Sequence, residues 1–110
     1  MKITSSVRPD GVAVLVAEGR INMVTAPELK REVQDAVNGG NARVAVDLSG
    51  VEFIDSSGLG ALVSGLKTAR TAGGDLRLAS ASEQVSSVLR LTNLDRILRI
   101  HSSVDDAYRD

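Results

Sequence analysis

The sequence predicts an α/β fold in which a small mixed sheet of about four to five strands is covered by about four helices. Three observations predict it. Short apolar runs typical of strands alternate with segments whose apolar residues recur at three- and four-residue steps, as in helices. Glycine pairs follow two of the helical segments, where helices commonly end. The alternation favours parallel neighbouring strands joined by right-handed helical crossovers.

The first elements are two strands. The apolar run at 12–17 follows a turn signal at 9–11, which contains proline, aspartate and glycine. Residues 3–7, before that turn, can pair with the run as the other arm of a hairpin. The chain is therefore expected to open with two antiparallel strands.

The first helix is expected to begin at 25–28. Thr25 can cap it, Glu28 can reach back to the cap, and Val24 can pack against Leu29 as a hydrophobic staple. Apolar residues then recur at helical spacing up to residue 37, and the glycines at 39–40 end the helix. The apolar run at 44–48 that follows is typical of a strand buried on both faces.

A turn is expected at 49–50, and the apolar run at 51–54 leads to a corner at Asp55. The second helix follows, because apolar residues recur at helical spacing until the glycines at 73–74. They are Leu59, Leu62, Val63, Leu66 and Ala69.

The last third of the chain is predicted to hold four short elements. Leu76 and Leu78 alternate with polar residues as a half-buried strand, and a short helix begins near Ser82. Residues 97–100 suggest a last strand. Residues 103–106 resemble a capping box with Asp in place of Glu, which would start a final helical turn.

Composition limits the function. With 110 residues, 43% of them hydrophobic, the chain is expected to form one domain over residues 1–110. A net charge of -1 and only two aromatic residues, Phe53 and Tyr108, argue against direct nucleic acid binding. Zero cysteines exclude disulfides and thiolate metal sites. No apolar stretch approaches the roughly 20 residues of a membrane span, so we expect no membrane partner and a cytoplasmic location.

The best functional evidence lies at residues 55–59, where the strand gives way to the helix. A serine at this corner is both a helix cap and a phosphate acceptor, since helix N-termini accommodate anions. Ser56 and Ser57 exceed what one cap needs, and Asp55 places a carboxylate within reach to orient a hydroxyl. Gly58 and Gly60 leave the backbone approachable by another protein. We therefore expect a binding module switched by phosphorylation, although the same residues could simply cap a helix.

An enzymatic reading finds less support. The hydrolase pattern Gly-x-Ser-x-Gly lacks its leading glycine around Ser56, and the only histidine, His101, has no identified partner. The glycines of the second helix do not form a phosphate-binding loop. Asp47, Glu52 and Asp55 are too loosely spaced to indicate a magnesium site. We therefore expect no catalytic residue, cofactor or metal.

Apolar residues near the corner are candidates for partner contact. For Val24 a role as hydrophobic staple, and for Leu59 a place in the core, is favoured over contact with a partner. Met23 is therefore the predicted contact.

Much of the chain resembles the STAS family, specifically the stand-alone anti-sigma factor antagonists of bacteria. The resemblance runs through 18–22 and 25–29, then 46–51, and is most specific at 53–60, Phe-Ile-Asp-Ser-Ser-Gly-Leu-Gly. It implies a small mixed sheet with helices packed on it. It also implies that an anti-sigma factor that is a serine kinase phosphorylates Ser56, and that a serine phosphatase reverses the mark. The unphosphorylated form would bind the kinase and free the sigma factor.

The resemblance also implies individual roles. Asp55 would orient Ser56, and Ser57, Gly58 and Leu59 would form part of the docking surface, completed by the loop around Asn22 and Met23. Family members commonly carry an acidic residue, leucine and aspartate after the glycine at position 19, whereas this chain has 20–22 Arg-Ile-Asn. This departure leaves the partner's identity open. The alternative is a scaffold subunit of a stress-sensing or lipid-transport assembly without an active phosphoswitch.

Overall fold

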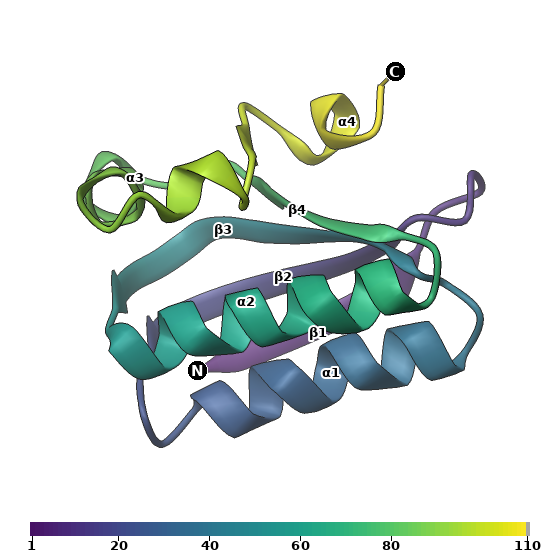
Figure 1. The fold of residues 1–110 in the computed structure, drawn as a ribbon, viewed down its shortest axis with the longest axis horizontal. Coiled ribbons are helices and arrows are strands. Elements are labelled where there is room, and N and C mark those ends of the chain that lie inside the picture. The colour runs from purple at the N-terminus through teal and green to yellow at the C-terminus, as the bar shows by residue number, and fades with distance from the viewer. Residues whose placement is uncertain (110) are drawn as a thin grey trace.

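The computed structural model describes residues 1–109 and has a five-stranded sheet at its centre. The strand order is β1-β2-β3-β4-β5, with β1 antiparallel to β2 and the other pairs parallel. Helices α1 and α2 lie side by side on one face of the sheet, while α3 and α4 lie on the other (Figure 1). The predicted mixed sheet with helices on it is confirmed.

The elements follow the predicted order. They are β1 (Lys2–Val7), β2 (Ala13–Ile21), α1 (Ala26–Asn38), β3 (Arg43–Ile54), α2 (Ser56–Thr71), β4 (Asp75–Ala79), α3 (Glu83–Leu91), the short 3-10 helix η1 (Leu94–Arg96), β5 (Ile100–His101) and α4 (Val104–Ala107). The opening hairpin and the helix ends near the two glycine pairs are confirmed.

The core is aliphatic and lies mainly between the sheet and the pair α1 and α2. Strand β2 shows the arrangement, since successive side chains of a strand point to opposite faces. Leu15 belongs to the large core on the α1 and α2 side, whereas Val12 and Val14 pack with Ala107 of α4 on the other side. Because both faces of β2 are covered, its sequence reads as a continuous apolar run.

Strand β3 is longer than the sequence indicated, and the turn expected at 49–50 was wrong. The strand continues to Ile54, with register irregularities against β2 on either side of the Glu18 and Gly50 pair. A Cβ added at Gly50 would lie 2.9 Å from Cγ of Glu18, so this glycine permits close approach of two strands. The extension carries Ile54 to the level of Ile21, and α2 begins there.

The C-terminal region departs from the prediction in one place. Strand β5 covers only Ile100–His101, while Ile97 follows η1 and is 40% exposed. The cap predicted for the last helical turn is confirmed, because Oγ of Ser103 accepts a hydrogen bond of 3.2 Å from the N–H of Asp106.

Tyr108 fastens this C-terminal region to the sheet. Its hydroxyl lies 2.8 Å from the carbonyl oxygen of Val44 and 2.9 Å from that of Asp75. The guanidinium of Arg77 lies 4.4 Å from the centre of its ring, a cation–π contact. Burial raises the pKa of the Tyr108 hydroxyl well above its ordinary value, because the phenolate would lose solvation.

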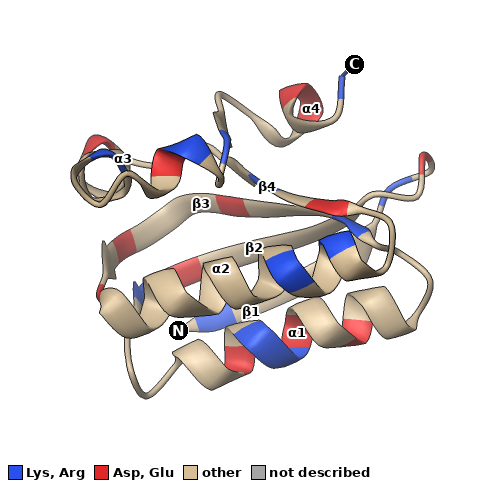
Figure 2. Cartoon of the chain, in the orientation of Figure 1, with Lys and Arg blue, Asp and Glu red and all other residues tan. Residues whose placement is uncertain are grey.

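Charged residues are spread over the helices, strands and connecting segments (Figure 2), and none of those in the described residues is buried. No helix in the part of the chain that the structure describes is long and apolar enough to cross a bilayer.

Candidate functional site

The candidate site lies where the carboxyl ends of β2 and β3 meet the start of α2. Because β2 and β3 are parallel, their ends reach the same edge of the sheet. The backbone N–H of Asp55 donates a hydrogen bond of 3.1 Å to the carbonyl oxygen of Ile21, which ties the two ends together. Ligand and partner sites in open α/β sheets commonly form at this edge.

Asp55 is the cap of α2. Its backbone is extended, with φ -104° and ψ -173°, and its Oδ1 accepts a hydrogen bond of 2.9 Å from the N–H of Gly58. The expectation that a serine caps this helix was therefore wrong, since Ser56 is the first helical residue. The carboxylate predicted to orient a hydroxyl is engaged with the helix backbone through one of its oxygens.

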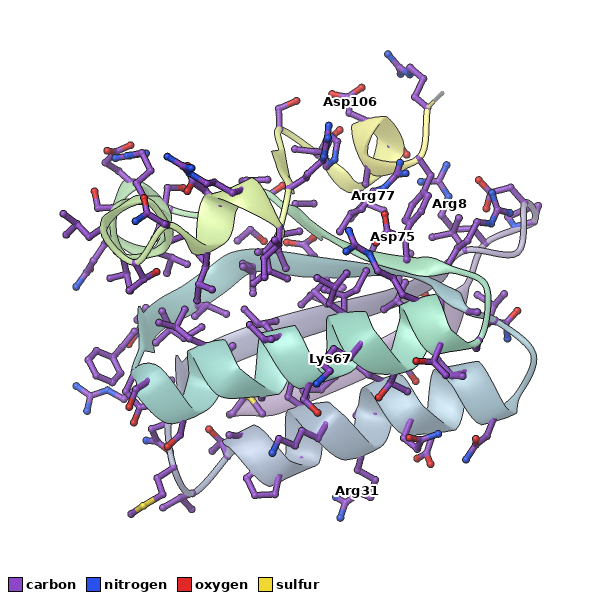
Figure 3. All side chains as sticks on the ribbon, in the orientation of Figure 1. Arg8, Arg31, Lys67, Asp75, Arg77 and Asp106 are labelled. Carbon is purple, nitrogen blue, oxygen red and sulfur yellow. The ribbon has the colours of Figure 1, made fainter. Side chains whose placement is uncertain are left out.

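Ser56 is exposed, and no other described residue holds its hydroxyl in a hydrogen bond. Ser57 is half-buried. Helix α2 carries no charged residue before Lys67, which Figure 3 labels midway along it. The first turns of the helix therefore present hydroxyls and small apolar groups.

Gly58 and Leu59 face inward. A Cβ at Gly58 would lie 2.7 Å from both the carbonyl oxygen of Ile21 and Cγ1 of Ile54. The expectation that Gly58 leaves the backbone open to a partner was therefore wrong, because this glycine lets α2 start against the strand ends. Gly60 is exposed, with no atom within 4 Å of an added Cβ. Leu59 is 7% exposed, which agrees with its interpretation as a core residue and not with the place on the docking surface that the resemblance implied.

Asn22 organises the loop between β2 and α1. Its Oδ1 accepts hydrogen bonds from the N–H groups of Val24, at 3.0 Å, and Thr25, at 3.2 Å. The hydroxyl of Thr25 donates to the carbonyl oxygen of Arg20 and accepts from the N–H of Asn22, both at 2.9 Å. Thr25 thus bonds backward into the loop and makes no side-chain cap bond to α1, contrary to expectation.

Three large apolar side chains are exposed on the segments that meet here. They are Met23 (73%), Val24 (81%) and Phe53 (40%). The staple predicted for Val24 was wrong, since its side chain lies in solvent. Ser56, Met23 and Val24 form what we call the corner surface, whereas Phe53 lines a small pocket with Gln84 and Val88 of α3. The guanidinium of Arg20 lies 5.6 Å from the centre of the Phe53 ring.

Sequence reasoning missed Phe53 as a surface residue. A signal was available: Phe53 and Ile54 are neighbours in a strand, and neighbouring side chains point to opposite faces. With Ile54 buried against the helix, Phe53 had to face the other way.

The other residues considered for chemistry lie elsewhere. Oδ1 of Asp47 accepts a hydrogen bond of 2.9 Å from the N–H of Ser49. Among residues 1–109, no three histidine, cysteine, aspartate or glutamate side chains gather as a group able to hold a metal ion. His101 lines a cavity to which Ser56 and Asp55 do not contribute.

Comparison with known proteins places this geometry in a family. The family model described as the STAS domain matches residues 4–107. The chain belongs to the STAS family. The strand-to-helix corner described above is thus part of a STAS fold.

Two relatives resemble this STAS protein over most of both chains. One is TM1081 from Thermotoga maritima, whose crystal structure is named as that of a candidate anti-sigma factor antagonist. It matches with a TM-score of 0.87 and 37% sequence identity, and the match covers 96% of this chain and 90% of TM1081. The anti-sigma-F factor antagonist RsfB of Mycobacterium tuberculosis is 30% identical over 100 residues, 89% of this chain and 80% of RsfB. The phosphorylated form of the Bacillus cell fate determinant SpoIIAA shares the fold, with a TM-score of 0.73 at 15% identity and 96% coverage of each chain.

Proposed function

We propose that this STAS protein is an anti-sigma factor antagonist that works as a phosphorylation-switched binding module. With Ser56 unphosphorylated, the corner surface binds an anti-sigma factor that is also a serine kinase. Phosphorylation of Ser56 by that kinase releases it, and a serine phosphatase restores the binding form. The protein performs no catalysis of its own in this cycle.

The observation that carries the proposal is the position of Ser56. Its hydroxyl is exposed on the first residue of a capped helix, next to the carboxylate of Asp55. A phosphate there adds about -1.5 to -2 charges at neutral pH. Because the fold does not use the Ser56 hydroxyl, and because helix N-termini favour negative charge, the modification leaves the scaffold intact.

The charge of the phosphate changes the binding affinity enough for phosphorylation to act as a switch. Without the phosphate, no charged side chain interrupts α2 between Ser56 and Leu66, and the exposed Met23 and Val24 of the neighbouring loop are apolar. A partner complementary to this surface would bury the new phosphate unpaired, at a cost of several kcal/mol. Since about 1.4 kcal/mol is tenfold in affinity, binding would fall by several orders of magnitude.

The two relatives at 30% identity or more support the choice of partner, since both are named as anti-sigma factor antagonists. Met23 and Asn22 would then have different tasks. Met23 contacts the partner directly, whereas Asn22 holds the loop that presents it. Leu59 and Gly58 act beneath the surface by fixing the start of the helix.

The test is phosphosite mapping on the protein purified from its own cells. The expected result is one phosphate on Ser56, which is absent from Ser56→Ala and still present in Ser57→Ala, the matched control at the adjacent hydroxyl. A phosphate on another residue, or full modification of Ser56→Ala, would overturn the switch. Stable co-purification with a large assembly, with no phosphate under any growth condition, would instead favour the scaffold role.

A further inference from the structure

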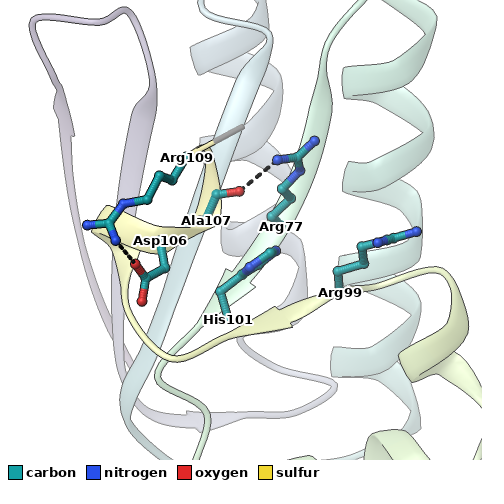
Figure 4. Close-up of a pocket in the computed structure, with 6 residues that line it drawn as sticks. All are labelled: Arg77, Arg99, His101, Asp106, Ala107 and Arg109. Carbon is teal, nitrogen blue, oxygen red and sulfur yellow. Dashed lines mark hydrogen bonds and ion pairs between the residues drawn. The ribbon is translucent and has the colours of Figure 1, made fainter.

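A second site, on the opposite face of the sheet from α1 and α2, is a cavity of about 290 Å³ between β4, β5 and the C-terminal segment. Its lining is mostly basic: Arg77, Arg99, His101, Asp106, Ala107 and Arg109 (Figure 4). Figure 4 shows Arg99 and Arg109 on opposite sides of the His101 ring. The cavity shares no residue with the corner surface.

The imidazole of His101 is the unusual group in this cavity. Its Nε2 is buried, and among the described residues it has no hydrogen-bond partner. Buried polar atoms in native proteins are nearly always paired, so an orphaned one points to a ligand or an ordered water. The backbone of His101 is held in the sheet, because the N–H of Ser80 donates a hydrogen bond of 2.9 Å to the carbonyl oxygen of His101.

The charges around the cavity select the kind of ligand. The guanidinium of Arg77 already has partners in the protein. It forms an ion pair with the carboxylate of Asp75, at 3.1 Å, and donates a hydrogen bond of 2.7 Å to the carbonyl oxygen of Ala107. Among the lining residues that the structure describes, Asp106 is the one that is acidic. Its carboxylate lies 2.6 Å from the hydroxyl of Ser102 and 3.1 Å from the guanidinium of Arg109.

Arg99 remains available. It makes no ion pair with any of residues 1–109, and it lines the cavity together with His101. Within residues 1–109, the lining thus contributes three guanidinium groups against one carboxylate, together with a ring that can donate from Nε2. The exposed side chains of Arg99 and Arg109 extend away from the His101 ring in Figure 4, and by turning inward they would bring guanidinium groups to the oxygens of a tetrahedral anion beside the imidazole.

We propose that this cavity is a binding site for a phosphate group, anchored by Nε2 of His101, toward which the exposed side chains of Arg99 and Arg109 turn from either side of the ring. The phosphate group binds either as the free ion or as part of a small phosphate monoester. This site is separate from Ser56, so its occupancy does not depend on the proposed switch.

The experiment uses the single histidine of the chain as its reporter. The imidazole C–H signals of His101 are followed by NMR at constant pH while inorganic phosphate, glycerol phosphate or sodium chloride is added at matched ionic strength. We expect a saturable shift with phosphate or its monoester and no saturable shift with chloride. Saturation by both phosphates indicates that the group alone is recognised, and saturation by the monoester alone indicates an organic phosphate.

Variants separate the site from general charge attraction. The double variant Arg99→Gln with Arg109→Gln should weaken phosphate binding at least tenfold, as expected for losing a charge-assisted hydrogen bond. The control Lys30→Gln with Arg31→Gln removes two positive charges from α1, where Figure 3 labels Arg31, and should bind like the wild type. An unmoved His101 signal, equal effects of chloride and phosphate, or equal losses in both double variants would overturn the proposal.

Discussion

The backbone N–H of Gly58 donates a hydrogen bond of 2.9 Å to Oδ1 of Asp55, so the acidic residue beside the proposed phosphosite is itself the cap of α2. Asp55→Ala removes this acceptor and should lower the free energy of unfolding by about 1 kcal/mol. Asp55→Asn keeps an oxygen acceptor and should lose clearly less. Urea unfolding of the three proteins measures the difference, and equal losses in both variants would show that the cap bond is not what Asp55 contributes.

The two glycines at the start of α2 should respond oppositely to alanine. Gly58→Ala places a methyl group 2.7 Å from the carbonyl oxygen of Ile21, so we expect a loss of about 1–3 kcal/mol. Gly60→Ala meets no atom within 4 Å and lies in an exposed helical position, so it should gain about 0.5–1 kcal/mol. Thermal unfolding of both variants checks the pair. A stable Gly58→Ala protein would contradict the packing described for this corner.

Asn22 is predicted to tolerate aspartate but not alanine. A carboxylate oxygen can accept the same two backbone hydrogen bonds that Oδ1 of Asn22 accepts from Val24 and Thr25, whereas alanine cannot. Asn22→Ala should therefore lower the free energy of unfolding by about 1–2 kcal/mol, and Asn22→Asp by less than about 0.5 kcal/mol.

The same pair of variants tests partner choice. Asn22→Asp adds one negative charge to the loop that presents Met23, so its affinity for the natural partner should change while its unfolding curve does not. If Asn22→Asp binds the partner with unchanged affinity, the charge at this position does not contribute to partner binding.

Tyr108 should make the protein less stable in alkali. Its pKa is raised in the folded state by burial, so above the ordinary tyrosine pKa of 10.0 the unfolded chain releases the phenolic proton first. The stability contributed by Tyr108 is therefore complete below pH 10 and decreases as pH rises above it. Because Tyr108 is the only tyrosine, its ultraviolet absorbance reports the ionisation directly.

The matched variant is Tyr108→Phe. It loses the hydroxyl contacts to Val44 and Asp75, at a cost of about 1 kcal/mol at neutral pH. Above pH 10 its unfolding free energy should decrease less steeply than that of the wild type. Parallel curves for the two proteins would contradict the buried position of this hydroxyl.

The order of elements could be predicted because each leaves a local pattern in the sequence. Leu15 and its neighbours form a run too apolar for an exposed strand, and the helices end near glycine pairs. The error at Gly50 has a physical reason. Ser-Gly is a common turn signal, but here the glycine accommodates the Glu18 side chain across a bulged strand pair, and that requirement is tertiary.

The candidate site was predictable in position but not in detail. The acidic and hydroxyl residues at 55–57 mark a helix start, yet which one caps depends on backbone angles that the sequence does not specify. Thr25 illustrates the same point, because its hydroxyl oxygen accepts a hydrogen bond from the N–H of Asn22 and makes no cap bond to α1. The cavity around His101 was not predicted, because strands β4 and β5 and the C-terminal segment that form it are brought together only by the fold.

The most direct test of whether phosphorylation of Ser56 controls partner binding compares the binding of one partner to two forms of this protein. The anti-sigma factor kinase of the source cell is titrated by calorimetry with the unmodified protein and with protein phosphorylated on Ser56, and the melting temperature of each form is measured beside it. We expect at least a hundredfold weaker binding after phosphorylation, with nearly equal melting temperatures. Equal affinities, or a phosphorylated form that unfolds far earlier, would contradict it.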